Sequence, residues 1–69
     1  ILLVDDEPAN LDLLQTVLEF DGFTSIVRAA DGDEAIARFE ATRPDIVLLD
    51  LHMPRRSGFE VLADLRART

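Results

Sequence analysis

Three aspartates have a residue type and a spacing that suit metal binding and phosphoryl transfer. Asp5 and Asp6 directly follow the apolar residues 1–4, and Asp50 directly follows the apolar residues 46–49. Clustered carboxylates repel one another unless a cation lies among them, and Mg²⁺, a hard ion that prefers oxygen ligands, meets that need. A carboxylate in such a site can also act as a nucleophile toward phosphorus. The three residues therefore predict a metal and phosphoryl-transfer site, provided that the fold brings them together.

The two apolar runs indicate how the fold could do so. Uninterrupted Val, Ile and Leu residues are typical of strands covered on both faces, as in a parallel sheet flanked by helices. A weaker strand is expected within residues 23–29. Right-handed crossovers should place the two apolar strands side by side. Ligands of an open α/β sheet bind outside the carboxyl ends of its strands, so the three carboxylates should open into one crevice. We therefore predict an α/β fold with the order βαβαβα.

Three helices are predicted between and after these strands. The first should begin near Pro8, because proline is tolerated in the first helical turn. The second should follow a turn around Asp31 and end before Pro44, since the residue preceding a proline avoids helical backbone angles. The third should begin at a capping box formed by Ser57 and Glu60. The expected buried stripes are Leu11, Leu14, Val17 and Leu18 on the first helix, Ala35, Ile36 and Phe39 on the second, and Phe59, Leu62 and Leu65 on the third.

Composition excludes several classes of function. The 69 residues include no cysteine, so disulfide scaffolds, thiolate metal sites and thiol catalysis are ruled out. Fourteen acidic residues against seven basic ones give a net charge of −7, which disfavours direct binding of nucleic acid by this segment. No apolar run approaches the roughly 18 residues of a membrane span, so no membrane interaction is expected. The predicted compartment is the cytoplasm.

Four segments, in this order, resemble the receiver domain of two-component response regulators. They are ILLVDDEP at residues 1–8, ADGDEA at 30–35, PDIVLLDLHMP at 44–54 and SGFE at 57–60. The resemblance implies a flavodoxin-like doubly wound parallel sheet, present in part, with strand order 2-1-3. It also implies that residues 1–69 are a partial receiver domain of three βα units. The fourth and fifth units, with the family's switch Ser/Thr and its Lys, would lie outside this sequence.

The same resemblance assigns roles to single residues. It implies that Asp50 is the phosphoacceptor, which takes its phosphoryl group from a sensor histidine kinase or a histidine phosphotransfer protein. Asp5 and Asp6 match the acidic pair that holds Mg²⁺, with Asp50 as a further ligand, and His52 matches the position whose backbone carbonyl completes the metal site. The implied function is phosphorelay signal transduction by a phosphoprotein that is not an enzyme, although its phosphoryl transfer and hydrolysis are self-catalysed. The resemblance does not indicate which output domain the protein carries.

Two other functions stay open at this point. A Mg²⁺-dependent phosphatase of the haloacid dehalogenase type also uses an aspartate at a strand end, but it needs a second aspartate where this chain has His52. A receiver-like docking module would keep the fold without gaining phosphate. Taken singly, Asp5 and Asp6 could also be acids that stabilise a helix N-terminus, and His52 could be a solvated loop residue. We further expect the strand at residues 46–49 to have an unpaired edge.

Overall fold

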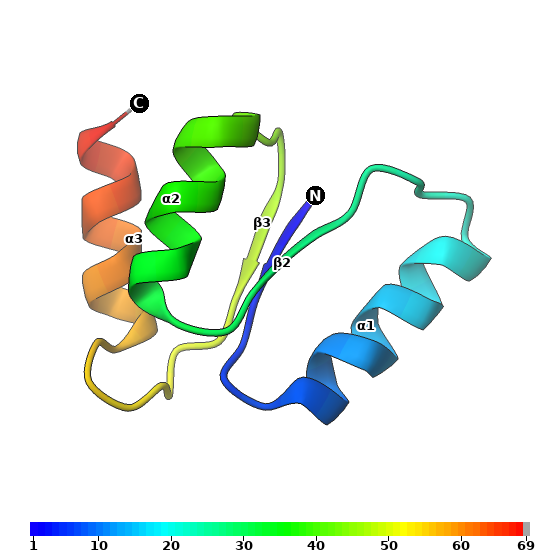
Figure 1. Cartoon of the computed structure of the whole chain (residues 1–69), viewed down its shortest axis with the longest axis horizontal. Helices are drawn as coiled ribbons and strands as arrows, with labels where there is room; N and C mark the ends of the chain where they lie inside the picture. Colours follow the sequence, from blue (N-terminus) through cyan, green and yellow to red (C-terminus); the bar gives the residue numbers. More distant parts are fainter. Residues whose placement is uncertain (69) are drawn as a thin grey trace.

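The structure is a computed structural model in which residues 1–68 are described. Three strands alternate with three helices, which confirms the predicted order (Figure 1). In chain order the elements are β1 (Leu2–Val4), α1 (Pro8–Phe20), β2 (Val27–Ala29), α2 (Gly32–Thr42), β3 (Val47–Leu49) and α3 (Gly58–Ala67).

The strands form one parallel sheet with β1 at its centre, in the order β2-β1-β3. Val4, the last residue of β1, is in register with Ala29 on one side and with Leu49 on the other. The predicted strand order 2-1-3 is therefore confirmed. Of the segment 23–29 in which a strand was expected, only Val27–Ala29 form one, because β1 has only three residues with which they can pair. Among the described residues β3 pairs with β1 alone, so it is an edge strand of the described sheet.

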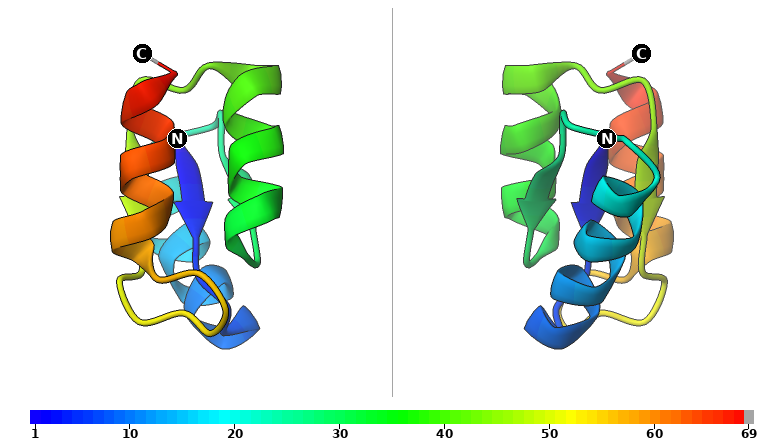
Figure 2. Two further views of the ribbon diagram at one scale, coloured as in Figure 1. Left: turned by 90° about the vertical axis from the view of Figure 1, so that its left-hand side faces the viewer. Right: turned by 90° about the vertical axis from the view of Figure 1, so that its right-hand side faces the viewer.

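Helix α1 covers one face of the sheet, and α2 and α3 cover the other (Figures 1 and 2). Alternate residues of a strand point to opposite faces, so Leu2 and Val4 point toward α2 and α3 while Leu3 points toward α1. The salt bridge between Arg28 of β2 and Asp12 of α1 lies on the α1 face. The main hydrophobic core lies on the α2–α3 face and consists of Leu2, Val4, Ala29, Ala35, Phe39, Met53, Val61 and Leu65.

The helix N-termini follow the local chemistry predicted for them. Pro8 occupies the first position of α1. The Asp31 side chain caps α2 by accepting a 2.8 Å hydrogen bond from the Glu34 amide. The Ser57 hydroxyl caps α3 by accepting a 3.3 Å bond from the Glu60 amide, which is one of the two bonds of the predicted capping box.

The buried stripe predicted for α3 is wrong at Phe59 and Leu62 and confirmed at Leu65. Phe59 and Leu62 are 63% and 42% exposed, whereas Val61 is fully buried and Leu65 is 4% exposed. The helix turns Gly58, Val61 and Leu65 inward, because Gly58 packs directly on the backbone that follows β3. Residues at positions i, i+3 and i+7 lie on one helix face, so burying Gly58 directs Phe59 toward solvent.

The other two predicted stripes are borne out to different degrees. On α2, Ala35 and Phe39 are buried. On α1 only Leu11 is buried among the predicted residues, and Val17 is 51% exposed, so its assignment to the core is wrong. The physical reason is that α1 lies over the central strand and the described residues place no second helix beside it on that face.

Candidate metal centre

Three carboxylates meet at the carboxyl edge of the sheet. One oxygen from each of Asp5, Asp6 and Asp50 lies within 4.8 Å of the others. Asp5 is buried, Asp50 is half-buried and Asp6 is exposed, so the cluster has a closed side and an open side. The structure thus brings together all three side chains that the sequence singled out.

Strand pairing places these residues beside one another. The Asp5 amide donates to the Ala29 carbonyl at 3.1 Å, and the Asp50 amide donates to the Val4 carbonyl at 2.9 Å. The backbone of both aspartates is therefore held by continuations of the sheet hydrogen bonds. Because β1 and β3 are parallel neighbours, their carboxyl ends place Asp5 and Asp50 at the same edge.

The Asp5 carboxylate is oriented by the start of α1. Its Oδ1 accepts a 2.9 Å hydrogen bond from the Glu7 amide, and its Oδ2 lies 3.4 Å from the Asn10 Nδ2 donor. An ionised carboxylate has about four acceptor positions, so these two bonds leave capacity for a metal ion. The spacing of the acidic residues does not by itself connect Asn10 with the site. Its position in the first turn of the helix that follows Asp5 is the signal that could have done so.

The Asp50 carboxylate is oriented by the loop that follows it. The His52 amide donates a 3.0 Å bond to Asp50 Oδ1, which is the geometry of an Asx turn. The His52 side chain is exposed, and the next residue, Met53, is buried in the core. The loop backbone is thereby fixed beside Asp50, while the imidazole points to solvent.

The first residue of α3 packs against the same backbone. The Gly58 amide donates to the Leu51 carbonyl at 3.2 Å. A Cβ atom at position 58 would lie 2.6 Å from the Leu51 Cα and still closer to the Asp50 carbonyl oxygen, so no side chain fits there. The N-terminus of α3 therefore sets the position of the peptide on which Asp50 sits.

The donor set suits a hard divalent cation. Within residues 1–68 none of the three carboxylates forms a salt bridge with an arginine, so their charge is not balanced by the chain itself. Mg²⁺ takes oxygen ligands, uses one or two carboxylates and keeps several waters, which an open cluster allows. A groove of about 390 Å³ runs from Asp5 and Asp50 along β3, where it is lined by Leu14 and Leu48. The site is thus accessible from solvent, as the predicted crevice requires.

No helix within residues 1–68 has the length and apolar character needed to cross a bilayer.

Comparisons with known proteins place this geometry in a family. The family model of the response regulator receiver domain matches residues 1–69. The chain is 44% identical over 66 residues to the transcriptional regulatory protein TrcR of Mycobacterium tuberculosis, covering 96% of this chain and 25% of the relative. It is 42% identical over 66 residues to the alkaline phosphatase synthesis transcriptional regulatory protein PhoP of Bacillus subtilis, covering 96% of this chain and 27% of that protein. The chain thus spans about a quarter of the length of these curated relatives.

Solved structures agree with the sequence matches. Chemotaxis protein CheY4 of Vibrio cholerae superimposes with a TM-score of 0.91 at 33% identity, over 97% of this chain and 55% of that one. A response regulator protein, TrrA, solved in complex with the histidine kinase ThkA, belongs to a structure that matches with a TM-score of 0.90 at 40% identity, over 99% of this chain and 58% of the matched chain. The fold, the strand order and the family match agree, and this chain belongs to the receiver domain family of two-component response regulators.

Proposed function

We propose that Asp50 accepts a phosphoryl group from a sensor histidine kinase or a histidine phosphotransfer protein, in phosphorelay signal transduction. The observation that carries this proposal is the juxtaposition of Asp50 with Asp5 and Asp6, whose oxygens lie within 4.8 Å of one another. A matched structure contains a response regulator protein in complex with a histidine kinase, which supports the choice of partner. We also propose a cytoplasmic location, in keeping with a chain that has no cysteine.

In this proposal Asp5, Asp6, Asp50 and the backbone carbonyl of His52 hold Mg²⁺. When bound, the ion would neutralise negative charge on the phosphoryl oxygens, which is the main requirement of phosphoryl transfer. The chain's own contribution is to hold the acids in place. Asp5 is fixed by the Glu7 amide and Asp50 by the His52 amide, so the cluster is organised before any ligand arrives.

The chemical step is a displacement at phosphorus. An oxygen of the Asp50 carboxylate attacks the phosphorus of the donor's phosphohistidine in line, forming a P–O bond as the P–N bond breaks. The electron pair of the broken bond stays on the imidazole nitrogen, and the product is an aspartyl phosphate. No oxidant or reductant is needed. The protein that carries the chain acts as an acceptor and not as an enzyme with turnover on a separate substrate.

The test is phosphorylation of the full-length protein by acetyl phosphate in the presence of Mg²⁺, followed by intact-mass measurement. We expect a gain of one phosphoryl group, lost in Asp50→Asn and lost when Mg²⁺ is chelated. Asp45→Asn is a matched control, since Asp45 is exposed and precedes β3 at the opposite end of the strand. A gain that survives Asp50→Asn, or no gain in the unmodified protein, would contradict the proposal.

The phosphatase alternative gains no support from the site. It requires a carboxylic acid two residues after the nucleophile, whereas the side chain at that position is the exposed imidazole of His52. The docking-module alternative predicts that Mg²⁺ has no measurable affinity for the carboxylate cluster, so the same protein titrated with Mg²⁺ tests it.

A further inference from the structure

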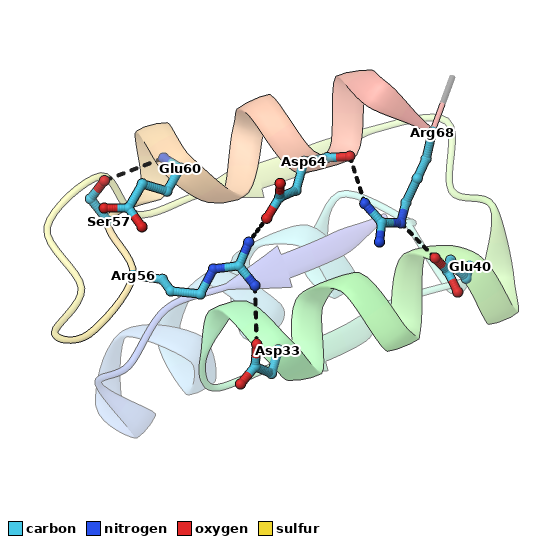
Figure 3. Close-up of polar contacts among 7 residues, drawn as sticks. All are labelled: Asp33, Glu40, Arg56, Ser57, Glu60, Asp64 and Arg68. Atoms are coloured by element: carbon cyan, nitrogen blue, oxygen red, sulfur yellow. Dashed lines mark hydrogen bonds and ion pairs between the residues drawn. The ribbon is translucent and has the colours of Figure 1, made fainter.

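Arg56, in the loop between β3 and α3, connects that loop to two helices. Its Nη1 donates a 3.0 Å hydrogen bond to Asp33 Oδ1 near the start of α2, and its Nη2 pairs with Asp64 of α3 (Figure 3). The Arg56 side chain is 29% exposed, whereas those of Asp33 and Asp64 are 88% and 43% exposed, so the arginine is the least exposed member of the group. A planar guanidinium with several donors is suited to joining two carboxylates at once.

The stem of Arg56 is packed as well as its head group. A Cβ atom built at Gly32, the first residue of α2, would lie 3.3 Å from both Cβ and Cδ of Arg56 and 2.8 Å from Val61 Cγ2. The arginine therefore lies tightly over the start of α2. Its backbone is turned at the same point, because Arg55 has a φ of 67° and the Arg56 amide donates to the Pro54 carbonyl at 2.8 Å. The loop is fixed at Arg56 through backbone, stem and head group together.

Short contacts connect the loop that Arg56 holds to the carboxylate cluster. Two residues after Arg56, Gly58 packs on the Asp50 peptide and bonds the Leu51 carbonyl. At the other end of the loop, the His52 amide bonds the Asp50 carboxylate. A shift of the loop or of α3 would therefore move both Asp50 and the His52 carbonyl.

We propose that Arg56 is a positioning residue for the phosphoacceptor site, acting through the loop at residues 51–57. The proposal rests on the proposed function, because it concerns the same Asp50 and the same metal. An exposed ion pair usually contributes little to stability. Arg56 differs because it joins two helices to a loop that contacts Asp50 through the His52 amide and is followed by Gly58, which packs on the Asp50 peptide. Its removal should loosen the site more than it destabilises the fold.

Arg56→Gln and Arg55→Gln in the full-length protein form a matched pair, since each removes one positive charge from adjacent loop positions. Arg55 has no ion pair in the described part of the chain. The first readout needs no metal: amide hydrogen exchange at His52 and Gly58. We expect exchange about fivefold faster in Arg56→Gln and unchanged in Arg55→Gln. Equal protection of both amides in the two variants would overturn the proposal.

The second readout is Mg²⁺ affinity by calorimetry, where positioning and simple electrostatics predict opposite signs. Removing a positive charge near an acidic cluster should strengthen cation binding, whereas loss of ligand positioning should weaken it by about tenfold. We expect weaker binding in Arg56→Gln and not in Arg55→Gln. Tighter binding in both variants would overturn the proposal.

Two further variants keep the result interpretable. Asp33→Ala and Asp64→Ala each remove one partner of Arg56, and each should reproduce part of the exchange effect without adding fully to Arg56→Gln. Full additivity would contradict a shared contact. If the unmodified protein binds no Mg²⁺ at all, the proposed function fails, while the exchange measurements still decide whether Arg56 holds the loop.

Discussion

On the face of the sheet that α2 and α3 cover, side chains form a continuous core, whereas the face under α1 buries little besides Leu3 and Leu11. Helices α2 and α3 both carry side-chain N-caps, and α1 has none. Arg68 adds a further link by pairing with Glu40 of α2 and bonding the Asp64 carbonyl (Figure 3). Large apolar side chains of α1 are instead exposed: Leu13, Val17 and Phe20.

The carboxylate cluster contains residues that are held from both faces of the sheet. Asp50 is held by the loop and helix of the well-packed side, whereas Asp5 is held by the first turn of the sparsely packed α1. The proposed in-line attack requires Asp50 to keep its orientation, and the tighter packing is on the Asp50 side. We therefore expect substitutions on the α2–α3 side to affect the site through backbone displacement, and those on α1 to affect it through single hydrogen bonds.

The largest effect is expected for Gly58→Ala. The added methyl would lie 2.6 Å from the Leu51 Cα and still closer to the Asp50 carbonyl oxygen, so the backbone must move. We expect a loss of about 2–4 kcal/mol in the free energy of unfolding. Phosphorylation of Asp50 should fall with it. Urea unfolding and acetyl phosphate labelling of the full-length protein measure both.

Gly22→Ala is the control for this prediction. Gly22 lies beyond α1 with a φ of +97° and has open space around its Cβ position, so only backbone strain opposes a side chain. The expected loss is about 1 kcal/mol, without an effect on labelling. If both substitutions lowered labelling equally, packing of α3 on Asp50 would not be the cause.

A second substitution pair compares the two faces directly. Leu65→Ala on α3 removes a side chain that is 4% exposed, and Leu13→Ala on α1 removes one that is 63% exposed. The first should lower the free energy of unfolding by about 2–3 kcal/mol, because it leaves a cavity in the core. The second should change it by less than about 0.5 kcal/mol. Chemical denaturation of both variants checks this, and similar losses would show that α1 is covered by other parts of the protein.

The sequence predicted the carboxylate cluster because that inference needed only the ends of two apolar strands. Parallel pairing has a regular register, and right-handed crossovers place such strands side by side, so placing Asp5 and Asp50 followed from the positions of two uninterrupted Val, Ile and Leu runs. The face of α3 that points toward the core could not be predicted in the same way. Glycine carries no hydrophobic signal, yet Gly58 decides which face of that helix points inward.

Arg56 illustrates a different limit of sequence reasoning. Two adjacent arginines in a loop are usually solvated, and nothing in their types distinguishes one from the other. Only the structure shows that Arg56 lies between Asp33 and Asp64, residues far apart along the chain. Long side chains that meet across elements depend on tertiary packing, which periodicity does not encode.

The smallest effect is expected on the α1 side, for Asn10→Ala. The Asn10 amide lies 3.4 Å from Asp5 Oδ2, a long hydrogen bond to a buried carboxylate that the Glu7 amide also holds. Losing it should weaken Mg²⁺ affinity by about threefold, which corresponds to roughly 0.6 kcal/mol and lies within the range of a single hydrogen bond.

Gln15→Ala removes a second amide from the same helix and serves as the control, because Gln15 bonds Arg28 at 3.2 Å and not an aspartate of the cluster. Calorimetric titration of both variants with Mg²⁺ gives the comparison. An effect of Asn10→Ala as large as that of Arg56→Gln would mean that α1 positions the metal ligands as firmly as α3 does. The two sides of the site would then be equivalent in function despite their unequal packing, because a buried carboxylate such as Asp5 can be oriented by a few directed bonds without a core behind it.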